Sequence, residues 1–170
     1  SIYKTTIVVG DYKDNYKGAA TGKIYIYERR KDKLERVSTI FGEAAADRFG
    51  YSVSIDNNFL AVGAYLNNDA GANAGKVYIY ERKGKDKWEK VFTITGETAG
   101  EQFGYSVSIS NNFLTVGANV NAETGFDVGK FYIYERKEKD KWEKVFTKFG
   151  EAADDTLGES VSINGNYLAV

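Results

Sequence analysis

Side chains that carry oxygen recur at matching positions in three glycine-containing segments of the chain. The second segment reads "AYLNNDAGANAG" (64–75) and the third reads "ANVNAETGFDVG" (118–129). Calcium takes six to eight oxygen ligands, mostly carboxylates and carbonyl groups. These two segments are therefore candidate calcium loops, with Asn67, Asp69, Asn73, Asn121, Glu123 and Asp127 as the candidate ligands. The first segment, "DYKDNYKGAATG" (11–22), fits less well because Tyr16 and Ala20 stand at two of these positions.

A second interpretation of the same residues stays open. Asn, Asp and Gly are also the residues that any tight, exposed loop uses, because they tolerate unusual backbone angles and bind their own backbone. A separate acidic segment, "GEAAADR" (42–48), has copies that begin at Gly96 and Gly150. It repeats a glutamate at Glu43, Glu97 and Glu151, and we interpret it as a solvated link between structural units.

The composition excludes most familiar kinds of catalysis. The chain has no histidine and no cysteine, so it cannot form a Ser-His-Asp triad, a thiolate metal site or a disulfide. We expect no catalytic residues and no required cofactor, and a hydrolase is the least favoured class. With 23 basic and 24 acidic side chains, the net charge of −1 disfavours nucleic acid as a partner. No apolar stretch approaches the ~20 residues that span a bilayer, so we expect no membrane insertion within the chain.

The elements that position these loops are predicted by a repeat. "FGYSVSI" occurs at 49–55 and again at 103–109, and "LGESVSI" follows at 157–163, so the copies start 54 residues apart. Such a fixed period is typical of proteins built from repeated structural units. Within each unit the apolar pieces are short, rich in Val, Ile, Phe and Tyr, and alternate in side-chain type, as in "KVYIYER" (76–82). This pattern predicts β-strands.

Four antiparallel strands in each repeat are the sequence pattern of a β-propeller blade. We therefore expect an all-β fold with about three blades and partial blades at both ends. The repeat units run from about 1–48, 49–102 and 103–156, and a further unit starts at 157–170. Trp88 and Trp142 hold one position of the outer strand and are expected to pack between neighbouring blades.

The motif of Phe-Gly, "YSVSI" and then "LAVGA" (60–64) or "LTVGA" (114–118) resembles the FG-GAP repeat, the blade unit of integrin α-subunit propellers and of many surface proteins. It is similar to the shorter FG-GAP form, with a tight turn where the integrin version carries a calcium loop. The proline of the motif is absent, and Tyr12, Tyr65 and Asn119 replace it. The resemblance implies a propeller that displays loops for partners, in an extracellular or cell-surface location.

Three units and one extra strand cannot close a ring, because propellers need at least ~4 blades. Three explanations stay open. The 170 residues are part of a longer chain; or the terminal strands complete a blade of another copy; or the protein is an open arc with exposed sheet edges.

The function that these patterns favour is a non-enzymatic structural or adhesion scaffold, cell-surface or secreted. Its expected partners are proteins, or other copies or segments of the same propeller. The alternative is a carbohydrate-binding, lectin-like propeller, in which a surface row of strand tyrosines stacks on glycans. Packing between blades would use the same tyrosines, which are Tyr25, Tyr27, Tyr78, Tyr80, Tyr132 and Tyr134. The lysine-rich tips such as "RKGKDK" (82–87) are expected to solvate and protect the outer sheet edges.

Overall fold

The computed structural model describes residues 1–120, 128–138, 141–152 and 154–170, and every regular element in these ranges is a β-strand. Blade 1 contains β1 (Ile2–Tyr3), β2 (Thr6–Asp11), β3 (Lys23–Arg30) and β4 (Lys33–Phe41). Blade 2 contains β5 (Ser52–Asp56), β6 (Phe59–Ala64), β7 (Lys76–Gly84) and β8 (Lys87–Thr95). Blade 3 contains β9 (Ser106–Ser110), β10 (Phe113–Ala118), β11 (Lys130–Glu138) and β12 (Lys141–Phe149). Blade 4 contains β13 (Ser162–Asn164) and β14 (Tyr167–Ala169).

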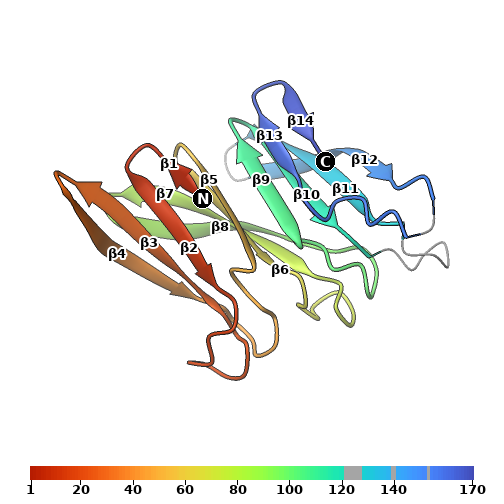
Figure 1. The fold of residues 1–170 in the computed structure, drawn as a ribbon, viewed down its shortest axis with the longest axis horizontal. Coiled ribbons are helices and arrows are strands. Elements are labelled where there is room, and N and C mark those ends of the chain that lie inside the picture. Colours follow the sequence, from red (N-terminus) through yellow and green to blue (C-terminus); the bar gives the residue numbers. More distant parts are fainter. Residues whose placement is uncertain (121–127, 139–140, 153) are drawn as a thin grey trace.

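The sheets confirm the expected propeller blades. In each of the first three blades the strands pair antiparallel in chain order, and blade 4 is a two-stranded sheet. The blades stand side by side, with β5, β9 and β13 next to one another, and the row of blades is open (Figure 1). No helix in the described part of the chain is long and apolar enough to cross a membrane.

Alternation along β7 places its two sets of side chains in two different cores. Tyr78 and Tyr80 join a buried cluster with residues of blade 1, while Val77 and Ile79 join a cluster with residues of blade 3. Tyr78 and Tyr80 are 0% and 6% exposed, and Tyr132 and Tyr134 of β11 are 0% and 6% exposed. Blade packing therefore uses these tyrosines, and the alternative of a surface row that stacks on sugars does not hold for the second and third copies.

The tryptophans of the outer strands also pack between blades, as expected. Trp142 of blade 3 is buried and meets the Phe59 ring of blade 2 edge-on, with a centroid distance of 6.3 Å. Trp88 of blade 2 packs against the cluster shared with blade 1. Leu34, at the same position in blade 1, is 53% exposed.

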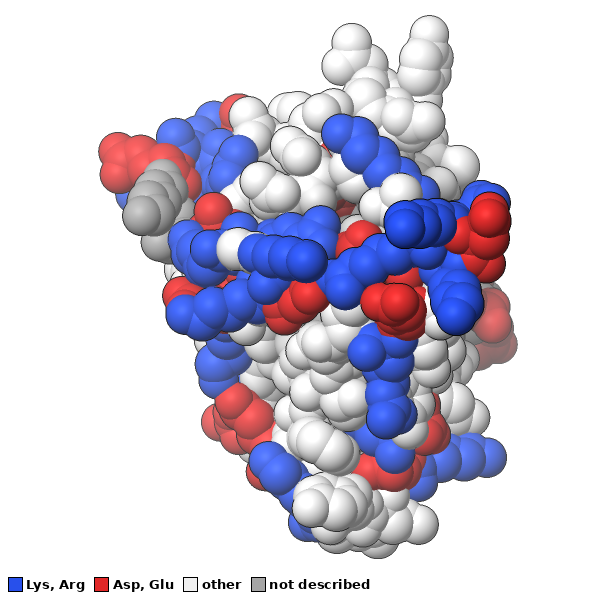
Figure 2. Space-filling model, turned by 90° about the vertical axis from the view of Figure 1, so that its left-hand side faces the viewer, with Lys and Arg blue, Asp and Glu red and all other residues white. Residues whose placement is uncertain are grey.

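The charged tips of the outer hairpins are balanced by ion pairs. Figure 2 views the left-hand side of Figure 1, where β3 and β4 lie, and it shows a band of Lys and Arg with Asp and Glu among them. Arg30 pairs with Glu35 in its own blade, and it donates to both carboxylate oxygens of Asp86 in blade 2, at 2.5 and 2.6 Å. These tips are solvated edges that also connect neighbouring blades.

The Phe-Gly motif forms the contact where neighbouring blades come closest. The N–H of Gly104 donates to the carbonyl of Gly117 in its own blade at 3.1 Å, while its carbonyl accepts a hydrogen bond from Ser52 of blade 2 at 2.7 Å. A Cβ placed on Gly63 would lie 2.0 Å from this carbonyl oxygen. We call this contact the glycine joint, and it recurs between Gly10 and Gly50, and between Gly117, Ser106 and Gly158.

A second set of serines connects the innermost strands. The hydroxyls of Ser1, Ser54 and Ser108 accept hydrogen bonds from the amides of Ile55, Ile109 and Ile163, at 3.1, 3.0 and 3.0 Å. Each serine lies in one blade and each isoleucine in the next. We call these hydrogen bonds between innermost strands the serine ladder. The two serines of "YSVSI" thus have separate roles, because Ser52 belongs to the glycine joint and Ser54 to the serine ladder.

The glycine joint makes a prediction about stability. In Gly63→Ala the new methyl group would overlap backbone atoms of Gly104, which cannot rotate away. We expect a loss of ~2 kcal/mol or more in the free energy of unfolding, measured by urea denaturation. Gly84→Ala is the matched control, because a Cβ there meets nothing within 4 Å. Equal stability of the two variants would contradict the joint.

Candidate functional site

The candidate ligands of the second loop bind protein groups. This loop joins β6 to β7, and Asn67 is buried at its base. The Asn67 side chain accepts a hydrogen bond from the Asp69 amide at 3.1 Å and donates to Asp47 at 2.7 Å. The Asp69 carboxylate lies 2.5 Å from the Lys76 ammonium. The lysine thus supplies the positive charge that a bound cation would supply.

Asn73 has a backbone role in the same loop. Its φ angle is 53°, and its amide donates to the Asn68 side chain at 2.7 Å. The first loop (11–22) has the same geometry, although alanine stands at the position of Asn73. Ala20 has a φ angle of 48°, and its amide donates to the Asn15 side chain at 2.6 Å. Because alanine takes this position without a side-chain oxygen, the turn does not require one from Asn73.

The first loop repeats the pairing of an acid with a lysine. Asp14 lies 2.5 Å from the Lys23 ammonium, and this hydrogen bond holds the pKa of the Asp14 carboxyl below its ordinary value. Among the residues that the structure describes, no group of three acidic side chains that could hold a metal ion is found. In loops 1 and 2 an acidic side chain is paired with a lysine.

The remaining candidate ligands are Asn121, Glu123 and Asp127 of the third loop, and they lie outside the described residues. Calcium binding by this chain stays a prediction.

The links before blade 2 and before blade 3 each carry a buried acid, Asp47 in the first and Glu101 in the second. Glu101 is fully buried and accepts hydrogen bonds from the amides of Glu97 and Thr98, at 2.8 and 3.0 Å. Its other oxygen accepts a hydrogen bond from the Tyr132 hydroxyl at 2.6 Å, while the Lys130 ammonium lies 3.6 Å from the oxygen that accepts the two amides. This carboxylate ties the link to β11 of the next sheet, and it has a structural role.

Between blades 1 and 2 the equivalent residue is Asp47, whose side chain is one methylene shorter than that of Glu101. Burial raises the pKa of the Asp47 carboxyl, and this carboxyl accepts a hydrogen bond from the Asn67 side chain. The Tyr78 hydroxyl, which matches that of Tyr132, has no hydrogen-bond partner among the described residues. Of the three glutamates that the sequence singled out, Glu43 and Glu97 form ion pairs with lysines of the following blade, Lys90 and Lys144. The third, Glu151, is exposed and pairs with Lys148 of the preceding blade.

A cluster of aromatic rings and one arginine forms where the first three blades meet. Tyr51 lies between three other tyrosines, with centroid distances of 5.1 Å to Tyr12, 4.4 Å to Tyr65 and 4.9 Å to Tyr105. Arg48 donates to the Tyr65 hydroxyl at 2.6 Å and its guanidinium lies over the Tyr12 and Tyr65 rings. We call these five residues the tyrosine rim.

The tyrosine rim lies at the ends of the inner strands. Tyr51 and Tyr105 precede β5 and β9, and Tyr12 and Tyr65 follow β2 and β6, so the rim shares one side of the blades with the second loop. Tyr65 is 7% exposed, and the other members are partly exposed. Burial raises the pKa of Tyr51 and of Tyr65, so both stay neutral phenols. Such a surface offers apolar ring faces and fixed hydrogen-bonding groups together.

The sequence contains a signal for the rim. A tyrosine follows Phe-Gly in two copies, and another tyrosine replaces the proline of the motif in two copies. Only the strand register shows that these two positions come together across neighbouring blades. In the later copies, Asn119 and Glu159 stand at the matching positions, so the rim is confined to the first three blades.

The calcium hypothesis for loop 2 can be tested with one variant. In Asp69→Asn the carboxylate is lost while the loop keeps its length. We expect the shift in melting temperature between excess calcium and excess EGTA to be the same in this variant and in the wild type. A smaller shift in Asp69→Asn would show that Asp69 binds calcium and would contradict the pairing with Lys76.

The two interior tyrosines give a matched pair of variants. Tyr132→Phe removes a donor to the buried Glu101 carboxylate, and we expect it to cost ~1–3 kcal/mol in the free energy of unfolding. Tyr78→Phe removes a hydroxyl that has no hydrogen-bond partner in the described part of the chain, and we expect it to be neutral or stabilising. Urea denaturation measures the free energy of unfolding of both variants. A larger loss of this free energy in Tyr78→Phe than in Tyr132→Phe would contradict the hydrogen bond between Tyr132 and Glu101.

Comparison with known families agrees with the fold. A model of the FG-GAP repeat matches residues 42–80 and 89–134, together half of the chain. No curated protein matches the sequence. The matched segments cover the Phe-Gly motifs at 49–50 and 103–104 and the glycine joint between blades 2 and 3. They also cover all members of the tyrosine rim except Tyr12. The chain is a member of the FG-GAP repeat family.

Proposed function

We propose that this chain is a non-enzymatic scaffold that binds a protein partner through the tyrosine rim, at a cell surface or in a secreted assembly. The observation that carries the proposal is the rim itself, four tyrosines and Arg48 in mutual contact on one side of the blades. Tyrosine and arginine are the residues, with tryptophan, that most often dominate the energy of protein interfaces.

Pre-organisation supports this assignment. Tyr51 contacts the Tyr12 ring on one side and the Tyr105 ring on the other. Arg48 is held by its hydrogen bond to the Tyr65 hydroxyl and by its position over the Tyr12 and Tyr65 rings. Side chains that are already ordered lose little rotamer entropy when a partner binds. The rim is therefore a better contact surface than the lysine tips, whose long side chains are exposed.

One further observation supports a non-enzymatic role, and a second supports a location outside the cell. The buried acids Asp47 and Glu101 bind protein groups of the blades, and the sequence has no histidine or cysteine to act beside them. FG-GAP repeats occur in extracellular and surface proteins, which supports the proposed location.

A lectin-like role is the second candidate, and it also depends on the rim. The strand tyrosines of blades 2 and 3 are buried and so present no ring face to a sugar. Tyr12 and Tyr105 are partly exposed and could stack on a pyranose ring. Binding of the purified chain to a glycan array separates the candidates, because saturable binding to one sugar class would favour the lectin.

The proposed contact surface makes a testable prediction. We expect Arg48→Ala and Tyr105→Ala to reduce cross-linking of the purified chain to proteins of a cell-surface extract by about tenfold or more. Lys85→Ala, an exposed change in the β7–β8 turn on the opposite side of the blades, is the control and should keep wild-type binding. Circular dichroism verifies folding of each variant. Unchanged cross-linking in both rim variants would contradict the proposal.

A further inference from the structure

Basic residues occur in the loops and links of only one copy of the repeat. The first loop carries Lys13 and Lys17, whereas the second and third loops contain no basic residue. In the links between blades, Arg48 is matched by Gln102 in the next copy and by Thr156 in the one after it. The basic character of this region therefore belongs to the first copy and not to the repeat as such.

The backbone holds Arg48 in a fixed turn beside the tyrosine rim. Its φ angle is 57°, its amide donates to the Ala20 carbonyl at 3.0 Å, and its carbonyl accepts from the Tyr51 amide at 3.1 Å. Gln102 takes the same φ angle of 57° and makes the matching pair of backbone hydrogen bonds. Because an uncharged side chain occupies the same turn one copy later, the fold of the link does not require the arginine.

Two cations lie against one ring of the tyrosine rim. The Arg48 guanidinium lies 5.9 Å from the centre of the Tyr12 ring, and the Lys13 ammonium lies 5.6 Å from the same centre. Arg48 is partly exposed and Lys13 is exposed. The bond to the Tyr65 hydroxyl is the one side-chain hydrogen bond of Arg48 within the described residues, and it uses one of several N–H groups. We call Arg48 and Lys13 the cation pair.

The acids around the cation pair are bound to other groups. Asp11 and Asp14 of the first loop pair with Lys23, at 3.7 and 2.5 Å. Asp47 of the link accepts a hydrogen bond from Asn67 at 2.7 Å. The acids of the second loop and of the start of the link pair with other lysines. In the described part of the chain, neither member of the cation pair forms a salt bridge.

We propose, on the basis of the function proposed above, that the cation pair binds carboxylate groups of a short acidic segment on the protein partner. A guanidinium binds a carboxylate through parallel N–H groups, and such charge-assisted hydrogen bonds are stronger than neutral ones. The partly exposed rings of Tyr12 and Tyr51 lie next to the cations and contact the apolar parts of the same segment.

The surrounding charge favours a short acidic segment over a long polyanion such as a sulfated glycan. The link before blade 3 (96–102) contains two acidic residues and no basic ones. The link before blade 4 (150–159) contains four acidic residues and no basic ones. A long polyanion that extended from the cation pair across these links would meet like charges and be repelled.

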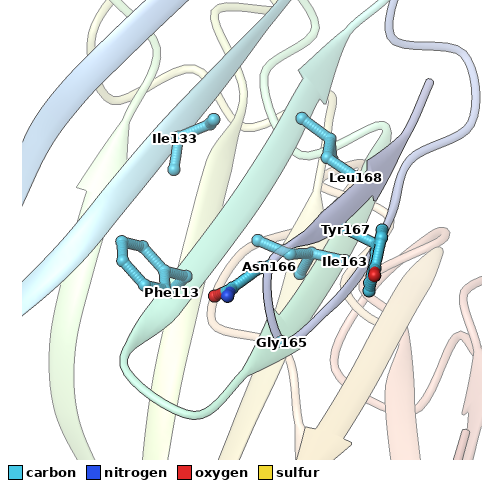
Figure 3. Close-up of a pocket in the computed structure, with 7 residues that line it drawn as sticks. All are labelled: Phe113, Ile133, Ile163, Gly165, Asn166, Tyr167 and Leu168. Atoms are coloured by element: carbon cyan, nitrogen blue, oxygen red, sulfur yellow. The ribbon is translucent and has the colours of Figure 1, made fainter.

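The apolar pocket between blades 3 and 4 does not suit such a ligand. Its volume is about 240 Å³, and its apolar wall is formed by Phe113, Ile133, Ile163 and Leu168 (Figure 3). None of the residues that line this pocket is charged, so a carboxylate would lose its hydration there without gaining an ionic partner. The cation pair is therefore the better site for an acidic ligand.

A pair of synthetic peptides tests the proposal. The probe is a fluorescein-labelled peptide of alternating glutamate and glycine, and its control has glutamine in place of each glutamate. Each peptide is titrated with the 170-residue chain while fluorescence anisotropy is recorded. We expect saturable binding of the glutamate peptide only, and weaker binding as the concentration of sodium chloride is raised. Absence of binding, or equal binding of the two peptides, would overturn the proposal.

Two variants that copy the second repeat locate the binding site. Arg48→Gln and Lys13→Leu introduce the residue types that stand at these positions one copy later, as Gln102 and Leu66. We expect Arg48→Gln to weaken binding of the glutamate peptide about tenfold or more, and Lys13→Leu to weaken it less. Lys85→Gln is the control, because it removes the same charge from the exposed β7–β8 turn. An equal loss in Lys85→Gln and Arg48→Gln would overturn the proposal.

A heparin fragment tests the other kind of anionic partner. We expect the fragment to bind the wild type and Arg48→Gln alike. Heparin binding that Arg48→Gln weakens, without any binding of the glutamate peptide, would assign the cation pair to a sulfated glycan and would overturn the acidic segment.

Competition separates this proposal from the function on which it rests. We expect excess glutamate peptide to reduce cross-linking of the purified chain to proteins of the cell-surface extract, as Arg48→Gln does. If Tyr105→Ala reduces cross-linking while the peptide and Arg48→Gln leave it unchanged, the rim binds its partner without an acidic contact. That result would overturn the acidic segment and leave the proposed function standing, whereas unchanged cross-linking in every rim variant would overturn the proposed function itself.

Discussion

The architecture depends on backbone atoms of neighbouring blades that approach too closely for any side chain. At the glycine joint, the carbonyl of Gly104 lies where a Cβ on Gly63 would be, and Ser52 donates to the same oxygen. This contact sets the spacing of β5 and β9, and that spacing brings Tyr51 within 4.9 Å of Tyr105. The candidate binding surface is thus a consequence of the packing contact beneath it.

The sequence predicted the strands, the blades and the family because these depend on local alternation and on a fixed period. It did not predict which hydroxyl binds which amide, because the partners Ser54 and Ile109 lie 55 residues apart. Alternation showed that Tyr78 and Tyr80 share one face of β7, but both a packed face and a free face would give that pattern. For the loops, composition alone could not separate a calcium site from a turn, because the deciding residue, Lys76, lies at the start of the next strand.

Differences between the repeats show which contacts are general and which are local. The glycine joint recurs at each boundary between blades, whereas the buried acid of the link is Asp47 in one copy and Glu101 in the next. Glu101 accepts a hydrogen bond from the Tyr132 hydroxyl, whereas the shorter Asp47 accepts one from Asn67. Function in such a chain is expected where the copies differ.

The most direct test of this account is native-state hydrogen exchange at the Ile109 amide, which donates to Ser54 of the preceding blade. The account predicts that this amide is protected in the wild type and exchanges faster in Ser54→Ala, while the Ile55 amide, which donates to Ser1, keeps its protection. Equal exchange of Ile109 in both proteins, or loss of protection at both amides together, would contradict a ladder of separate contacts between blades.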